Sequence, residues 1–176
     1  MSLGDVNVYI DNIDPGSFQY WCAQDEAPTA SEVQAFFDEI KFTLLGEFCE
    51  FASSRLSGFH IEVPEEVWPR RQGGAHWWFL YGLSVFGIGR DVPEWLDLRS
   101  QYKKFQVDSS RELLPFMRVV SDADRYCFTR EGRIVHWCHE THSTTIVDES
   151  FANCLLRELR ALEARKDRVI RGEMTK

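Results

Sequence analysis

A run of short apolar segments in the second half of the chain constrains the fold more than any other feature. These segments are 116–120, 125–129, 133–140 and 144–147. Clusters of turn-forming residues separate them, and one separator is Glu131-Gly132, where the glycine can take the positive φ of a hairpin turn. Segments this short and this closely spaced are typical of an antiparallel meander.

The meander runs directly into a segment with helical periodicity. Asp148 and Ser150 provide side-chain oxygens that can cap a helix N-terminus. The apolar residues that follow recur on one helical face: Phe151, Leu155, Leu159, Leu162 and Val169. Because such a helix must bury its apolar face, we expect it to pack on the sheet. The predicted fold class is α+β, with a single, mostly antiparallel sheet of about five or six strands packed against several α-helices.

The length predicts a single domain, residues 1–176, since a chain of this size can bury one hydrophobic core. Residues 1–54 are predicted to be an acidic N-terminal extension that contains a long helix. Thr29 or Ser31 can cap this helix, which we expect to reach about Ser53.

Two other apolar segments lie outside the meander. Residues 7–10 read as a strand followed by turn-forming residues. The aromatic segment 75–88 is consistent with one or two buried strands broken at a glycine.

The cysteines and the apolar runs indicate a compartment. Cysteines are odd in number and form no Cys-x-x-Cys pair, which favours free thiols in a reducing cytoplasm: Cys22, Cys49, Cys127, Cys138 and Cys154. No apolar run approaches the length of a membrane span, and the first residues lack the features of a signal peptide. We therefore expect a soluble cytoplasmic protein without a membrane partner.

The net charge of −8 is distributed unevenly along the chain. Residues 1–65 hold twelve acids against Lys41 and Arg55, a net charge of −10, whereas residues 66–176 hold sixteen acids against eighteen bases, a net charge of +2. A surplus of acid in one region favours a basic partner and argues against nucleic acid as a ligand.

Within the acidic region, four glutamates form a stripe on the predicted long helix: Glu32, Glu39, Glu47 and Glu50. They have few basic i+4 partners, so repulsion between the like charges destabilises the helix. A partner that neutralises these charges would be favoured. Asp25 and Glu26 lie in the preceding loop, and Trp77 is a candidate interface anchor because tryptophan so often serves as one. The alternative is an ordinary solvated helix face.

A metal site is conceivable in the third meander segment. On one strand, alternate residues share a face, so His136, Cys138, Glu140 and His142 would project to the same side as possible zinc ligands. Ligands two residues apart on a strand are nevertheless about 7 Å apart, too far to meet one ion without a bend. We therefore favour an ordinary strand and predict neither a metal nor another cofactor.

Two further polar groups have structural interpretations. Asp122 and Asp124 could pair as acid and base, but acids at this spacing in a turn more often cap the local backbone. The last helix carries arginines opposite its apolar face, which we interpret as a solvated surface: Arg157, Arg160, Arg168 and Arg171. No catalytic motif is recognisable, and we predict that the protein is not an enzyme.

The residues of the meander resemble those of the SUKH superfamily, the Smi/Knr-like proteins. The resemblance rests on a strand ending in two acids, an aromatic strand, a glycine turn, a Val-x-Trp strand with His-Glu, and Ser-Phe opening a terminal helix. The matching residues are Asp122, Asp124, Tyr126, Phe128, Gly132, Val135, Trp137, His139, Glu140, Ser150 and Phe151. Upstream, Val63-Pro64-Glu65-Glu66 and Gly73-Gly74 are similar to two further motifs of that superfamily.

The resemblance implies an immunity protein that binds and neutralises a cognate bacterial toxin, in many cases a nuclease. The acidic N-terminal region independently suits a protein that occupies a basic cleft. A regulatory adaptor of the same fold is the first alternative, and a hydrolase with a metal in the His136–His142 segment is the second.

Overall fold

The computed structural model describes residues 2–22, 27–69, 80–108 and 112–173. Seven strands form one sheet in chain order, and every neighbouring pair is antiparallel. The strands are β1 (Gln19–Trp21), β2 (His60–Glu62), β3 (Gly82–Val85), β4 (Leu113–Val119), β5 (Arg125–Thr129), β6 (Ile134–Trp137) and β7 (Thr144–Ile146). The α+β class with one antiparallel sheet is confirmed, although the described residues form seven strands rather than five or six.

The meander forms β4 to β7 and ends in the helix α5 (Phe151–Ile170), as its sequence predicts. Gly132 has a φ of 80° in the β5–β6 turn, and Ser150 caps α5 by accepting a hydrogen bond from the Asn153 N–H at 3.4 Å. The remaining helices are α1 (Leu3–Asp11), α2 (Ala30–Ile40), α3 (Gly46–Ala52) and α4 (Leu98–Asp108).

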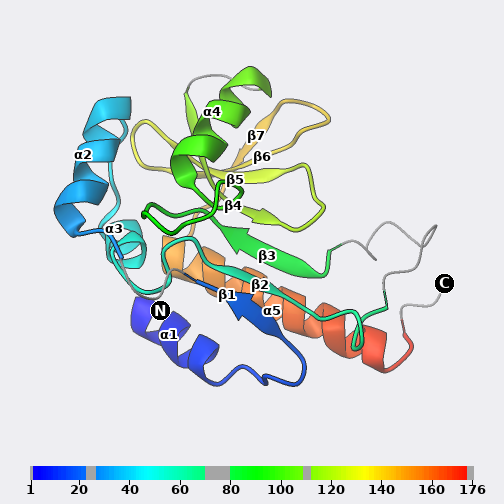
Figure 1. Ribbon diagram of the computed structural model, residues 1–176. Coiled ribbons are helices and arrows are strands. Elements are labelled where there is room, and N and C mark those ends of the chain that lie inside the picture. The colour runs from blue at the N-terminus through cyan, green and yellow to red at the C-terminus, as the bar shows by residue number, and fades with distance from the viewer. Residues whose placement is uncertain (1, 23–26, 70–79, 109–111, 174–176) are drawn as a thin grey trace.

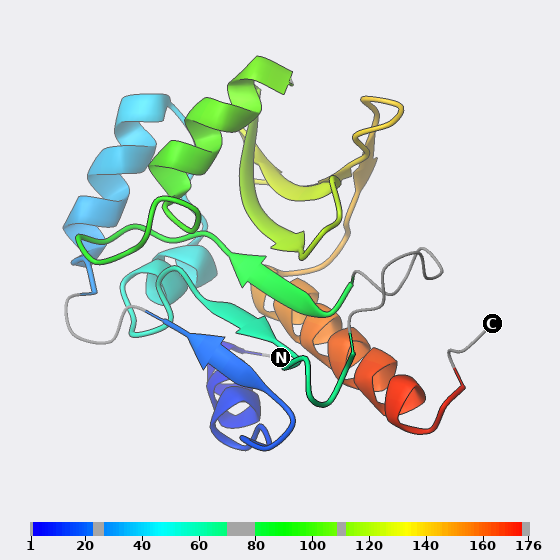
Figure 2. The same ribbon diagram turned by 45° about the vertical axis from the view of Figure 1, so that its right-hand side comes forward.

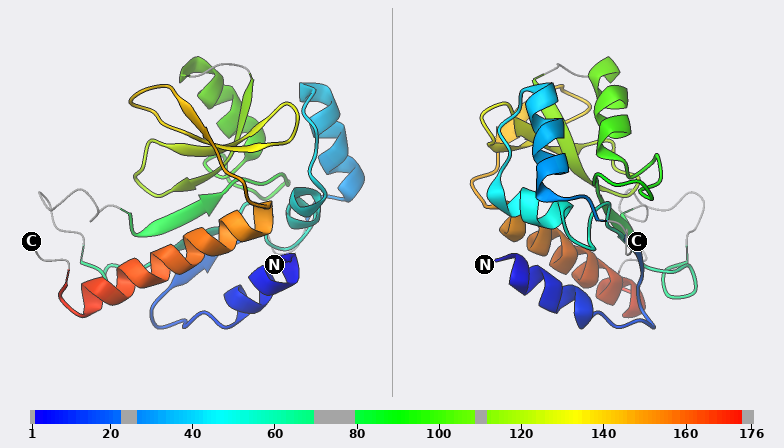
Figure 3. Two further views of the ribbon diagram at one scale, coloured as in Figure 1. Left: turned by 180° about the vertical axis from the view of Figure 1, so that it is seen from behind. Right: turned by 60° about the vertical axis from the view of Figure 1, so that its left-hand side comes forward.

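Helices cover both faces of the sheet. Figures 1 and 3 show α5 along one face with α1 beside it, and α4 on the opposite face. Figure 2 shows α2 and α3 at one end of the sheet. None of the helices within the described residues combines the length and the apolar character needed to cross a membrane.

Aromatic rings fill the core between the sheet and α5. Phe48 of α3 lies 5.0 Å from Phe128 of β5 and 5.2 Å from Phe151 of α5, measured between ring centroids. Phe116 stacks on Phe128 at 4.2 Å. Val6 of α1 and Val33 of α2 belong to the same buried cluster, so these helices pack against the core of the sheet and α5.

A smaller apolar cluster lies on the other face, under α4. Its members are Phe105, Leu113, Cys127, Val135 and Trp137. Cys127 and Phe128 therefore face opposite sides of β5, as the alternation of a strand requires.

Two predicted elements are wrong. The long helix from Thr29 to Ser53 is interrupted after Ile40, where Lys41 takes a φ of 59°. The chain is held in this break by a hydrogen bond from the Thr43 N–H to the Arg130 carbonyl at 2.8 Å, a tertiary contact that helical periodicity cannot reveal.

The segment 7–10 is part of helix α1, not a strand. Val6 and Ile10, four residues apart, are its buried positions, and a capping box formed by Ser2 and Asp5 starts the helix. In the segment 75–88, β3 is a strand, while Trp77 and Trp78 lie outside the described residues.

Candidate functional site

The four glutamates of the predicted stripe do not form one continuous row. Glu32 and Glu39 lie on α2, and Glu47 and Glu50 lie on α3, with the break at Lys41 between them. Asp25, Glu26 and Trp77 lie outside the described residues. The structure therefore divides the acidic stripe into two parts with different surroundings.

Glu32 has a structural role at the start of α2. Its carboxylate accepts hydrogen bonds from the backbone N–H of Thr29 at 2.8 Å and from the Thr29 hydroxyl at 2.9 Å. These two hydrogen bonds lower the pKa of the Glu32 carboxyl below its ordinary value. This is a capping box, which a sequence of the form Thr-x-x-Glu predicts.

Glu32 and Glu39 also line a cleft of about 450 Å³ that contains Arg90 and Arg99. The Arg99 guanidinium lies 5.3 Å from the centroid of the Phe36 ring, which forms one wall of this cleft. The positive charge near these two glutamates thus comes from residues far away in the sequence rather than from i+4 positions on the helix.

The two glutamates of α3, Glu47 and Glu50, have different surroundings. The Glu47 carboxylate accepts a hydrogen bond at 3.0 Å from the backbone N–H of Ala152, in the first turn of α5. A carboxylate at this position accepts a hydrogen bond from an otherwise unpaired N–H, and its negative charge interacts favourably with the positive end of the helix dipole. Glu50 is exposed and makes no hydrogen bond or ion pair with any described residue.

Glu47 also lines the largest of the described clefts, which we name the β7 cleft. It has a volume of about 620 Å³ and lies between α3, the β5–β6 turn and the segment from β7 to α5. The side chains that give it its character are Glu47, Arg133, Ile146, Asp148, Glu149 and Asn153. The lining thus contains three carboxylates and one guanidinium.

The β7 cleft combines negative charge with an apolar edge. Ile146 of β7 is 64% exposed, and all three residues of β7 are exposed. Glu149 is paired with Arg157 at 3.1 Å, whereas Asp148 has no partner among the described side chains. The Asn153 side-chain oxygen is buried without a hydrogen-bond donor from the described residues. Such a cleft suits a lysine or arginine, whose aliphatic stem packs on apolar surface while its charged end meets carboxylates.

The proposed metal-ligand geometry in the third meander segment is absent from the structure. β6 ends at Trp137, so Cys138 and the residues after it leave the strand. His136 packs on Tyr126 at 5.0 Å, while His142 lies in a turn with a φ of 52° and packs on Trp137 at 5.7 Å. In the part of the chain that the structure describes, no three His, Cys, Asp or Glu side chains form a group that could hold a metal ion.

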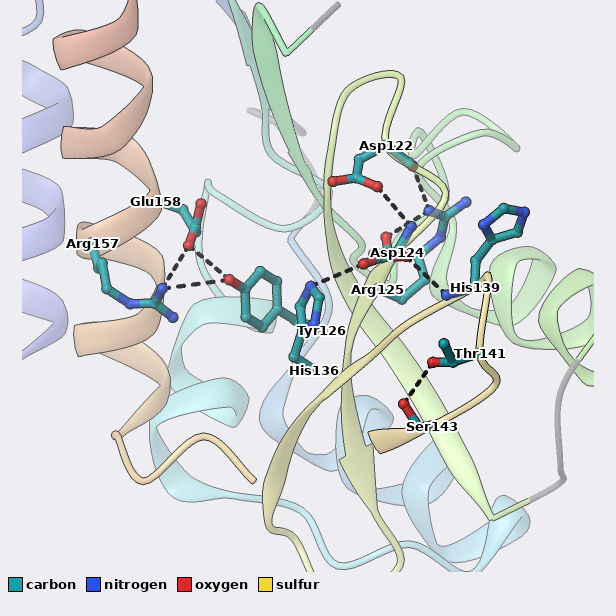
Figure 4. A network of polar contacts seen from close by, with 10 residues as sticks. All are labelled: Asp122, Asp124, Arg125, Tyr126, His136, His139, Thr141, Ser143, Arg157 and Glu158. Carbon is teal, nitrogen blue, oxygen red and sulfur yellow. Dashed lines mark hydrogen bonds and ion pairs between the residues drawn. The ribbon is translucent and has the colours of Figure 1, made fainter. Parts of the chain in front are cut away.

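The Asp122 and Asp124 pair belongs to the turn between β4 and β5, shown in Figure 4. The Asp122 carboxylate accepts a hydrogen bond from the Asp124 N–H at 3.0 Å, and the Asp124 carboxylate accepts one from the His139 N–H at 2.8 Å. Asp122 therefore caps the backbone of its own turn, as its structural interpretation predicts, whereas Asp124 joins this turn to the segment that follows β6.

The same view shows a buried polar contact that sequence reasoning missed. The Tyr126 hydroxyl donates to the Glu158 carboxylate at 2.8 Å, and Arg157 donates to the same carboxylate oxygen at 2.9 Å. Burial, together with the neighbouring Glu158 charge, raises the pKa of Tyr126. Of the four arginines that we interpreted as a solvated face, Arg157 is therefore part of the contact between α5 and the sheet.

Comparison with known proteins gives no further identification. No family model, no curated protein and no solved structure matches this chain.

Proposed function

We propose that this chain is a non-enzymatic, cytoplasmic immunity protein that binds and neutralises a cognate bacterial toxin, with nucleases among the candidate toxins. The observation that carries the proposal is the β7 cleft, which gathers Glu47, Asp148 and Glu149 beside the exposed Ile146. The resemblance of the meander to SUKH immunity proteins supports it, because three of the residues that carry the resemblance, Gly132, Ser150 and Phe151, line the cleft.

The chemistry of the cleft favours a basic protein partner. A basic side chain inserted there would meet the unpaired Asp148 carboxylate and pack its stem on Ile146. Glu50 lies one helical turn after Glu47 on α3 and extends the negative potential outside the cleft. Complementary charge accelerates association and rejects partners of the wrong sign.

The edge strand β7 adds a second means of binding. β7 pairs with β6 on one side, and among the described strands none pairs with its other edge, which an extended segment of a partner could therefore use. Backbone hydrogen bonds along the edge give affinity, whereas the charged cleft gives specificity.

Co-expression with the product of the neighbouring gene tests this function. We expect the parent chain to relieve the toxicity of that product and to co-purify with it. Asp148→Lys and Ile146→Asp should each weaken rescue, because they reverse the charge and the polarity of the cleft without removing a described contact.

Glu140→Lys is the matched control, since Glu140 is also exposed and lies on the meander but outside the cleft. Stable binding to the neighbouring product without any relief of toxicity would favour the regulatory adaptor instead. Full rescue by both cleft variants would exclude the β7 cleft as the interface.

A further inference from the structure

We propose that a second cavity, independent of the β7 cleft, binds a small ligand in which an oxyanion is attached to a flat ring. The cavity has a volume of about 370 Å³ and lies between α4 and the ends of β5 and β6. Its lining consists of Phe105, Ala123, Arg125, Trp137, His139 and His142, and we name it the ring pocket. Cavities of roughly 300 Å³ and above are large enough for small ligands.

Arg125 is the cation of the ring pocket. One of its terminal nitrogens, Nη1, donates to the carbonyl oxygens of Asp122 and Asp124, each at 2.8 Å. Its other terminal nitrogen and Nε donate to no described residue, so a bidentate face of the guanidinium is left for a ligand. Figure 4 shows this guanidinium on the same side of the turn as the His139 ring.

A second guanidinium close to Arg125 favours the binding of an anion. Met117 of β4 pairs with Tyr126 of β5, so Arg118 lies beside Arg125 on the adjacent strand. Arg118 lies over the Phe86 ring at 6.0 Å, and its buried Nε has no acceptor among the described residues. Burial lowers the pKa of both guanidinium groups, and the Arg118 charge lowers that of Arg125 further. Like charges on neighbouring strands destabilise a sheet, and a bound oxyanion would relieve this repulsion.

The nearby carboxylates do not fully occupy these donors. Asp122 and Asp124 face Arg125 and offset part of its charge, but the Asp122 carboxylate accepts the Asp124 N–H and the Asp124 carboxylate accepts the His139 N–H. Asp124 also faces the His136 ring nitrogen at 3.7 Å, on the side of the sheet that carries Tyr126.

The walls of the ring pocket are aromatic. The Phe105 and Trp137 rings meet edge-to-face at 4.8 Å, and Trp137 meets the His142 ring at 5.7 Å. His142 has a φ of 52°, an uncommon backbone conformation for a residue other than glycine. In this conformation its ring contacts Trp137. Aromatic walls favour a planar ring, and two imidazoles add hydrogen-bond donors around it.

Titration calorimetry with four probes tests the assignment: phenyl phosphate, benzoate, inorganic phosphate and phenol. We expect phenyl phosphate or benzoate, or both, to bind at one site in the millimolar range, and the tighter of the two identifies the oxyanion. Inorganic phosphate and phenol should each bind more weakly, because each offers only half of the recognised ligand.

Three variants locate the binding. Arg125→Gln should weaken binding about tenfold or more, since it removes a charge-assisted contact. Arg118→Gln should weaken binding about threefold, because it removes positive potential near the pocket. This second variant tests the proposal even if the Arg125→Gln variant does not fold. Arg168→Gln is the control, because this exposed arginine lies near the end of α5, and it should bind like the parent chain.

Absence of saturable binding by both phenyl phosphate and benzoate would overturn the proposal. So would parent-like affinity in both Arg118→Gln and Arg125→Gln. If inorganic phosphate binds as tightly as phenyl phosphate, the aromatic walls of the ring pocket do not contribute to binding, and this part of the proposal is contradicted.

Discussion

Glu158 is a charged residue that is only 7% exposed, and it lies on the face of α5 that packs on the sheet. It is tolerated there because the Tyr126 hydroxyl and the Arg157 guanidinium both donate to its carboxylate. A buried carboxylate with two donors ties the helix to β5 at one defined position, since any slip would leave the charge unsatisfied.

The Tyr126 hydroxyl should therefore contribute to stability. Tyr126→Phe removes a hydrogen bond to a buried charge, and we expect the free energy of unfolding to fall by about 1–2 kcal/mol. Tyr20→Phe is the control, because Tyr20 is 45% exposed and its hydroxyl bonds to no described residue. Urea denaturation measures both variants, and equal stability of the two would contradict the role of this contact.

Cys154 gives a prediction about alkaline pH. Burial in α5 raises the pKa of its thiol to about 12, whereas in the unfolded chain it ionises near its ordinary value of 9.0. Between these two values the unfolded chain has lost a proton that the folded chain keeps, so the free energy of unfolding must fall as the pH rises.

Cys154→Ala should make this alkaline decline shallower, whatever its effect on stability at neutral pH. Urea denaturation of the parent chain and the variant, repeated from neutral pH to above pH 9.0, measures the two slopes. Identical slopes would mean that the Cys154 thiol is not protected from ionisation in the folded protein.

At the scale of elements, α3 carries two glutamates with separate roles. Glu47 accepts the Ala152 N–H at the start of α5, and Glu50, on the same helix, has no described partner. Glu47→Ala should lower the free energy of unfolding by about 1 kcal/mol, as the loss of other N-terminal capping contacts does. Glu50→Ala should change it by less than about 0.5 kcal/mol. Thermal denaturation compares the two, and a larger effect at Glu50 would refute the assignment.

Local sequence determines the elements that were predicted correctly. The strands β4 to β7 pair with their neighbours along the chain, and Ser150 starts α5, so short-range patterns contain the necessary information. Helix α1 was missed although its capping box and the spacing of Val6 and Ile10 are local signals, whereas the break after Ile40 and the strand β1 depend on distant contacts. The three-residue strand β1 is too short to show alternation and pairs with β2, about forty residues away.

The candidate sites could also be predicted only in part from the sequence. Sequence alone identified the acids of α2 and α3, but not the arginines that face Glu32 and Glu39 or the α5 N-terminus that uses Glu47. Spacing along one strand also suggested a common face for His136 and His142, which the end of β6 separates. Residues from remote segments decided the surroundings of the glutamates, whereas the end of a strand decided the outcome for the two histidines.

For the molecule as a whole, the two proposed sites lie on different elements and recognise opposite charges. The β7 cleft is acidic and is formed by α3, β7 and the start of α5, whereas the ring pocket presents Arg125 and two histidines beside α4. A basic protein and a small anion could therefore bind without competing for the same side chains.

The central claim is that this protein binds a basic protein partner through the β7 cleft. Its most direct test is the dissociation constant of the complex with the purified product of the neighbouring gene, measured at low and at high salt. We predict that Asp148→Lys weakens binding about tenfold at low salt and much less at high salt, while Glu140→Lys binds like the parent chain. An unchanged dissociation constant for Asp148→Lys and Ile146→Asp at both salt concentrations would contradict the account.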